Sequence, residues 1–149
     1  MSKQENETYK SAGVDIAAGE EAVQRIIPHV ETTLRPEVLT SIGGFGGAFD
    51  ITKTGRTHPV LVSSTDGVGT KINIARIAND YTTIGEDLVA MCVNDVICSG
   101  AKPLYFLDYI STKKIDDNVA DIMVGILKGC EISDMQLLGG ETAEHPRQT

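Results

Sequence analysis

A short and almost wholly apolar run in the second half of the sequence most constrains the fold. This run, Leu104–Ile110 (LYFLDYI), is apolar at nearly every position, which predicts a strand buried on both faces of a sheet. The segment before it, residues 83–98, has apolar residues at helical spacing and opens with a capping box, in which Thr83 caps and Glu86 reaches back. Gly100 then supplies the left-handed residue that ends a helix. We therefore expect a helix that leads into a buried strand.

The remaining segments add helices and strands without strict alternation. Asp116 is positioned to cap the next predicted helix, and Met135–Leu138 predicts a last strand. His58–Ser63 is short and β-branched, which predicts a further strand near the middle of the chain. Residues 22–30 predict an amphipathic helix that Pro28 kinks or splits. This order of elements favours an α+β domain over a doubly wound parallel sheet.

The composition is that of an acidic globular protein. The chain has 149 residues, of which 41% are hydrophobic, and this suffices for one domain with a core. No stretch is apolar enough to span a membrane, and the polar start lacks the apolar part of a secretory signal, so we expect a cytoplasmic protein. The formal charge of −8 argues against nucleic acid as a partner and implies that a polyanionic ligand is held through divalent cations or backbone amides. The three cysteines lack metal-site spacing and are expected to be buried thiols.

The run Ser64–Lys71 (STDGVGTK) directly follows the predicted β-branched strand. Neither of the two commonest glycine motifs for nucleotides is present, so this turn is the candidate phosphate site in their place. Gly67 and Gly69 would let backbone amides approach a phosphate, and Lys71 would add a positive charge. Asp66, at the end of the strand, suits a hard cation such as Mg²⁺. A tight surface turn that carries an ordinary Asp and Lys is the alternative interpretation.

Three further acids occupy positions that favour a common metal site. Asp95 stands beside Asn94 in a helix with apolar neighbours, where an unpaired carboxylate would be costly. Glu141 follows the pair Gly139–Gly140 at the end of the last strand, although an ordinary loop acid would look the same. Asp108 lies within the apolar strand, and both a buried hydrogen-bonding role and a site role are open for it. Acids at the ends of elements beside glycine turns are typical of sites for Mg²⁺ and polyphosphate.

These motifs resemble the amino-terminal half of the aminoimidazole ribonucleotide synthetase family, also called phosphoribosylformylglycinamidine cyclo-ligases. The likeness extends from Tyr9 to Pro146, with several long motifs in the same order. The motifs are Tyr9–Ile16, Gly43–Gly46, Thr65–Lys71, Ile84–Asp95, Gly100–Pro103, Phe106–Tyr109 and Gly139–Glu144.

The resemblance implies a fold, a reaction and a set of roles. Members have a mixed or antiparallel four-stranded sheet packed with helices, which pairs with that of a second subunit to close an eight-stranded barrel. They use ATP and Mg²⁺ to activate the amide oxygen of formylglycinamidine ribonucleotide, and ring closure gives aminoimidazole ribonucleotide, ADP and phosphate in de novo purine biosynthesis. By the same resemblance, Asp66, Asp95 and Glu141 are the expected metal ligands. The expected nucleotide contacts are Lys10, Gly67, Gly69, Thr70, Lys71, Asn94, Gly139 and Gly140.

The resemblance also implies an incomplete enzyme. We expect residues 1–8 to be a solvated tail and residues 9–149 to be an ATP-binding and dimerisation domain, because members of the family continue into a second α+β domain that this chain lacks. The chain alone is then expected to be inactive. Two alternatives stay open: another member of the same superfamily, such as thiamine-phosphate kinase or selenophosphate synthetase, and a non-catalytic dimerising module that binds nucleotide.

Overall fold

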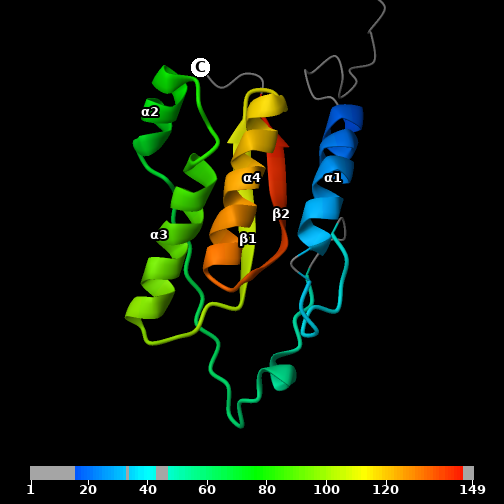
Figure 1. Cartoon of the computed structure of the whole chain (residues 1–149), viewed down its shortest axis with the longest axis vertical. Helices are drawn as coiled ribbons and strands as arrows, with labels where there is room; N and C mark the ends of the chain where they lie inside the picture. Colours follow the sequence, from blue (N-terminus) through cyan, green and yellow to red (C-terminus); the bar gives the residue numbers. More distant parts are fainter. Residues whose placement is uncertain (1–15, 33, 43–46, 146–149) are drawn as a thin grey trace, which may run out of the picture.

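The computed structural model describes residues 16–32, 34–42 and 47–145, whose arrangement is shown in Figure 1. In chain order the elements are α1 (Ile16–Glu31), the 3₁₀ helix η1 (Ile51–Thr54), α2 (Lys71–Ala78), α3 (Ile84–Cys98), β1 (Tyr105–Thr112), α4 (Asp117–Ile132) and β2 (Gln136–Glu144). The predicted tail of residues 1–8 lies outside the described residues, as do Lys10 and the Gly43–Gly46 motif.

The sheet that the described residues form has two strands, β1 and β2, which pair in parallel. Their register places Asp108 opposite Gly140, with an irregularity between Phe106 and Leu107. Both strands predicted in the second half of the chain are confirmed, and each extends further toward its carboxyl end. The expected burial of the first strand on both faces is wrong, because Leu107 and Tyr109 alternate with the buried residues and are exposed. A mixed or antiparallel four-stranded sheet was expected, whereas these two strands are parallel because α4 returns the chain to the end from which β1 started.

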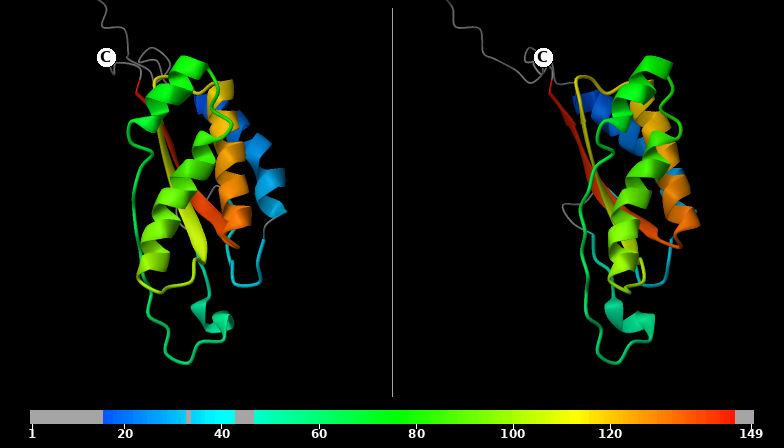
Figure 2. Two further views of the ribbon diagram at one scale, coloured as in Figure 1. Left: turned by 60° about the vertical axis from the view of Figure 1, so that its left-hand side comes forward. Right: turned by 90° about the vertical axis from the view of Figure 1, so that its left-hand side faces the viewer.

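The predicted strand His58–Ser63 is wrong for this structure. The segment pairs with no strand among the described residues, and Val60 and Leu61 are 87% and 54% exposed. Figure 2 shows this part of the chain running alongside the sheet outside the helical layer. β-branched residues favour a strand where a neighbouring strand pairs with the backbone and covers one face, and neither condition is met here.

The helices lie on one face of the sheet, and the core fills the space between these two layers (Figure 2). Helices α3 and α4 approach closely through glycines: a β-carbon on Gly85 would overlap the backbone of Ile122 and Ile126, and one on Gly129 would overlap Val89. No helix among the described residues is long and apolar enough to cross a membrane. The buried core consists of Val30, Val89, Cys92, Phe106, Ile110, Val119, Met123, Ile126, Cys130, Met135 and Leu137.

The ends of the helices test the predicted caps one by one. The Asp116 carboxylate accepts a hydrogen bond from the Asn118 amide and caps α4, as expected. Thr83 precedes α3, but its side chain makes no capping bond, because its backbone is already near-helical rather than extended. Gly100 has a φ of 77° and follows α3 in the left-handed conformation, as expected. Helix α1 continues across Pro28, so the helix is not split there.

Candidate functional site

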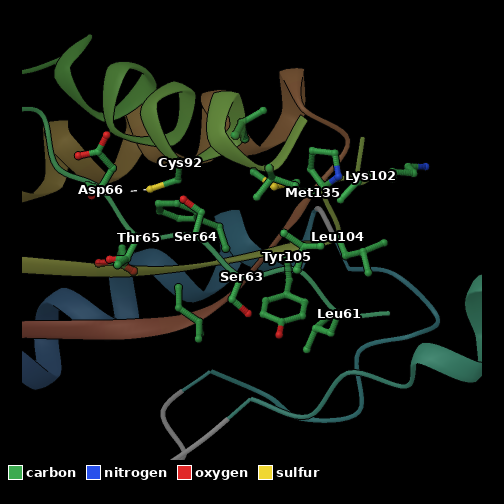
Figure 3. Close-up of a pocket in the computed structure, with 18 of the residues that line it drawn as sticks. Leu61, Ser63, Ser64, Thr65, Asp66, Cys92, Lys102, Leu104, Tyr105 and Met135 are labelled. Carbon is green, nitrogen blue, oxygen red and sulfur yellow. Dashed lines mark hydrogen bonds between the residues drawn. The ribbon is translucent and has the colours of Figure 1, made fainter. Parts of the chain in front are cut away.

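A groove of about 1300 Å³ separates β1 from the segment that runs beside it (Figure 3). One wall is formed by residues 104–111 and the other by residues 58–68, while Cys92 and its neighbours on α3 close one side. Of the residues singled out in the sequence, Asp66, Gly67 and Asp108 line this groove. The groove is therefore the place where the glycine turn and the buried strand come together.

Two side-chain contacts hold the Ser64–Asp66 stretch against α3. The Ser64 hydroxyl donates a hydrogen bond of 3.0 Å to Oδ2 of Asp95, and the Cys92 thiol lies 3.7 Å from the Asp66 carbonyl oxygen as a donor. Figure 3 shows the Cys92 contact as a dashed line. These contacts bring Asp66 and Asp95, two predicted metal ligands that are far apart in sequence, to the same turn of α3.

The charges of Asp66 and Asp95 both act on the Cys92 thiol. Burial raises the pKa of the Cys92 thiol, and the negative charges of Asp66 and Asp95 raise it further, against a lowering by the hydrogen bond to the Asp66 carbonyl. Both acids are exposed, so they are open to a ligand from solvent. The buried thiol between them stays protonated and is not a nucleophile at neutral pH.

The predicted phosphate turn leads directly into α2. Gly69 has a φ of 58°, a left-handed conformation that favours glycine, and Thr70 precedes the first residue of the helix, Lys71. The Lys71 ammonium lies 3.5 Å from Oδ1 of Asp87, and both side chains are about half exposed. A surface ion pair of this kind is weak, so the ammonium is available to a stronger anion. The Asp66 carboxylate accepts a hydrogen bond of 2.7 Å from the Gly67 amide.

The third predicted metal ligand, Glu141, belongs to a second group of acids on the sheet. Glu141 lies on β2 opposite Tyr109, directly after Gly139 and Gly140. Burial raises the pKa of Asp108, on the neighbouring strand, to about 6, and the charge of Glu141 adds to the rise. The pKa of the Cys130 thiol is raised to about 12, first by burial and then by the Asp108 charge. Glu141, Asp108 and Cys130 thus form one electrostatic group.

The structure therefore brings Asp66 and Asp95 together and associates Glu141 with Asp108. Among the described residues, no three His, Cys, Asp or Glu side chains are arranged to hold a metal ion. The carboxylate oxygens of the predicted ligands are nevertheless the donors that Mg²⁺ prefers. Asn94 is exposed on α3 next to Asp95, and Lys10 lies outside the described residues.

Sequence reasoning missed helix α2 and the two contacts that orient the acids. Helix α2 is short, and two of its isoleucines, Ile74 and Ile77, are 68% and 88% exposed, so its apolar spacing does not mark a buried face. Ser64 was visible as part of the STDGVGTK motif, but its bond to Asp95 spans 31 positions and has no local signal. All three cysteines were expected to be buried thiols, which is confirmed for Cys92 and Cys130 and wrong for Cys98, the last residue of α3, which is exposed.

Comparison with known proteins identifies relatives over most of the chain. Residues 47–149 match the family described as "AIR synthase related protein, N-terminal domain". A phosphoribosylformylglycinamidine cyclo-ligase of Trichlorobacter lovleyi is 56% identical over 140 residues, which are 93% of this chain and 40% of that protein. The protein of the same name in Leptospira interrogans is 53% identical over 145 residues, which are 96% of this chain and 42% of the relative. The chain thus spans about two fifths of the length of these relatives.

A solved structure has the same fold at much lower sequence identity. Thiamine-monophosphate kinase from Stenotrophomonas maltophilia superposes with a TM-score of 0.63 at 20% identity. The superposition covers 81% of this chain and 38% of the kinase. At this identity the likeness supports the arrangement of helices and strands, and no residue role follows from it.

Proposed function

Because the chain belongs to the AIR synthase related family, as its N-terminal domain, we propose that it is the amino-terminal part of a phosphoribosylformylglycinamidine cyclo-ligase. The observation that carries the proposal is an identity of 56–57% over 93% of the chain with proteins of that name. The proposed reaction is the ATP-dependent ring closure of formylglycinamidine ribonucleotide to aminoimidazole ribonucleotide, with release of ADP and phosphate. It belongs to purine biosynthesis and is proposed to occur in the cytoplasm.

Three acids, of which Asp66 lines the groove, are the proposed metal ligands. Asp66 and Asp95 lie against one turn of α3, and their oxygens suit Mg²⁺. Glu141, on the sheet, is the third proposed ligand. When bound, Mg²⁺ supplies positive charge that neutralises the phosphates of ATP. The formal charge of the chain, −8, favours a polyphosphate ligand that is held through such a cation or through backbone amides.

Backbone and side-chain donors at the start of α2 are the proposed phosphate contacts. Gly67 and Gly69 let a phosphate approach the backbone closely, and Thr70 and Lys71 follow at once. The Gly67 amide donates to the Asp66 carboxylate in this structure and would exchange that bond for the phosphate. Lys71 reaches the nucleotide by exchanging its weak contact with Asp87 for the stronger phosphate charge. The remaining proposed nucleotide contacts are Lys10, Asn94, Gly139 and Gly140.

A homodimer is the proposed assembly, without nucleic acid or membrane as a partner. The open edge of β1 faces the groove, and the segment His58–Ser63 lies across it without pairing. We propose that in the dimer this segment joins β1 and β2 as a third strand of the expected four-stranded sheet, and that this sheet meets that of a second copy. The support for this proposal is the exposed apolar surface that the sheet and the segment carry in one copy.

Substitution of Asp95, on α3, and of Asp66, on the neighbouring loop, tests their proposed role as metal ligands. Asp66→Asn and Asp95→Asn are each expected to weaken Mg²⁺-dependent ATP binding by this chain at least about tenfold, a loss that even outer-shell partners of metals produce. Isothermal titration with and without Mg²⁺ measures this binding. In a complete enzyme of the family, the same two changes should abolish ATP-dependent ring closure.

Asp117→Asn is the matched control. The substitution removes the same charge, and the Asp117 carboxylate is fully exposed at the start of α4. Its affinity for Mg²⁺ and ATP should equal that of the wild-type chain. Wild-type affinity in both Asp66→Asn and Asp95→Asn would contradict the metal assignment.

The second candidate function is a dimerising module that binds nucleotide without turnover. It is favoured by one observation, namely the exposed apolar surface of the sheet, which suits association with a second copy. A chain that binds Mg²⁺ and ATP and dimerises, yet shows no ATP-dependent ring closure, would establish this candidate. Ring closure by the chain alone would exclude it.

A further inference from the structure

Asp108 carries a buried charge for which the fold supplies no counter-charge. It is the one charged side chain among the described residues that is buried, with 8% of its surface exposed. Strand β1 directs it toward the helical layer, between Phe106 and Ile110, two members of the core. Within the part of the chain that the structure describes, it forms no ion pair and no hydrogen bond with another residue; its own backbone amide is its donor. The ionisable groups that interact with it are the Glu141 carboxylate and the neutral Cys130 thiol, and neither is a cation.

Glycine at position 140 leaves room for the Asp108 carboxylate. The two residues face each other across the β1–β2 pair, and a β-carbon on Gly140 would overlap Oδ1 and Cγ of Asp108. The strand position opposite Asp108 is therefore restricted to glycine by the carboxylate itself. The same pairing leaves one side of the carboxylate without a covering side chain from β2.

A buried carboxylate that faces no cation and no donor from another residue is destabilising, because its own backbone amide replaces only part of the lost hydration. Packing alone does not require a carboxylate at position 108, because the neighbouring positions on the same face, Phe106 and Ile110, are filled by apolar residues. Asp108 also lines the groove between β1 and the segment beside it, so a ligand in the groove can reach its exposed fraction. The missing cationic partner is accordingly expected from a ligand.

We infer that Asp108 is a substrate-binding residue whose carboxylate pairs with the amidine group of formylglycinamidine ribonucleotide. The inference rests on the proposed function, which supplies the identity of the substrate. An amidine presents N–H groups on two nitrogens of one carbon, and these match the two oxygens of a carboxylate, as a guanidinium does. Of the acids that line the groove, Asp66 belongs to the proposed phosphate turn and Glu37 pairs with Arg35. Asp108 is therefore the acid of the groove left for the nitrogen end of the substrate.

The test compares two ligands that differ at the amidine. Isothermal titration measures the affinity of the chain for formylglycinamidine ribonucleotide and for its amide counterpart, in which oxygen replaces the amidine nitrogen. The wild-type chain should prefer the amidine by at least about tenfold, the effect of a hydrogen bond to a charged group. Asp108→Asn should remove this preference and leave the affinity for the amide within about twofold. Asp117→Asn, an exposed change of the same kind on α4, should keep the wild-type preference.

A measurement on the unaltered chain covers the case in which Asp108→Asn does not fold. With aspartate carboxylates labelled with ¹³C, one signal should titrate near pH 6, as expected for Asp108. The amidine ligand should shift that signal, and the amide counterpart should not.

Three results would overturn the inference. They are an unchanged amidine preference in Asp108→Asn, equal shifts of the carboxylate signal by the two ligands, and binding of neither ligand to the wild-type chain. Binding of ATP with Mg²⁺, measured on the same samples, reports on the proposed function separately. If that binding is present while Asp108 proves indifferent to the amidine, the proposed function stands and this inference fails.

Discussion

Asp108 shows how one residue couples stability to pH in this fold. Burial is the main cause that raises its pKa from 3.8 to about 6, and the neighbouring charge of Glu141 adds to it. A carboxyl group whose pKa is higher in the folded state binds its proton more tightly there than in the unfolded chain. Its contribution to stability is therefore fully present below about pH 3.8 and is lost as the pH rises through about 6.

Asp108→Asn is expected to stabilise the chain at neutral pH, because it replaces a buried charge by a neutral group of the same shape. The rise in pKa corresponds to a free energy of unfolding of the order of 3 kcal/mol, so the gain near pH 7.5 should be up to about that size. Near pH 4 the gain should almost vanish, since the wild-type carboxyl is then protonated in the folded state. Urea denaturation at the two pH values measures the difference.

The exposed Asp117→Asn change serves as the control and should show no comparable rise near pH 7.5. Equal stability of Asp108→Asn and wild type at both pH values would mean that the carboxylate is hydrated in solution. A stabilised variant that has lost its preference for an amidine would show a residue retained for binding at the expense of stability.

At the residue scale, the acids could be named from the sequence, but their grouping could not. Asp66 and Asp95 meet because Ser64 and Cys92 hold the loop on α3, and such contacts leave no periodic trace. The association of Asp108 with Glu141 follows from the register of β1 and β2, which depends on the length of the α4 crossover. The type of a residue indicates its chemistry, while tertiary contacts decide which residues form one site.

At the scale of elements, the long helices and the paired strands followed from their patterns. Helices α3 and α4 have apolar stripes over about four turns each, so tertiary packing and local preference agree. The cap at Asp116 was found because an extended residue with a carboxylate has a simple signature, whereas Thr83 has the right residue type in the wrong backbone conformation. The His58–Ser63 prediction failed because a strand requires a partner, and a single-sequence pattern does not say whether one exists.

The contact between α3 and α4 depends on glycine at one position. Gly85→Ala is expected to lower the free energy of unfolding by about 1–3 kcal/mol or more, because the new methyl group would overlap the backbone of Ile122 and Ile126, which cannot turn aside as a side chain can. Urea denaturation followed by circular dichroism measures this loss.

Gly19→Ala in α1 is the matched control for helical glycine. Its new methyl group would lie 3.8 Å from the Ile115 side chain, an ordinary contact, so the change should be neutral or stabilising by up to about 1 kcal/mol. If Gly85→Ala were as stable as Gly19→Ala, the close approach of the two helices would not exist in solution.

At the scale of the whole molecule, one copy leaves apolar surface on the sheet uncovered. The helices cover one face, and on the other Leu107 and Tyr109 are 56% and 62% exposed. The open edge of β1 adds unpaired backbone groups along the groove. Exposed strand edges and apolar faces favour association with another chain, and a second copy with the same surface is the simplest partner.

Leu107→Lys is therefore expected to convert a dimer into a monomer. In the dimer, the lysine ammonium would be buried between the two sheets without a charged partner. Sedimentation equilibrium over a range of concentrations measures the change as a rise in the dissociation constant of at least about tenfold. Val124→Lys is the control, since Val124 is equally exposed, at 56%, but lies on α4 and should leave the dimer intact. A wild-type chain that stays monomeric at high concentration, or equal dissociation by both lysine variants, would show that the sheet face is not the interface.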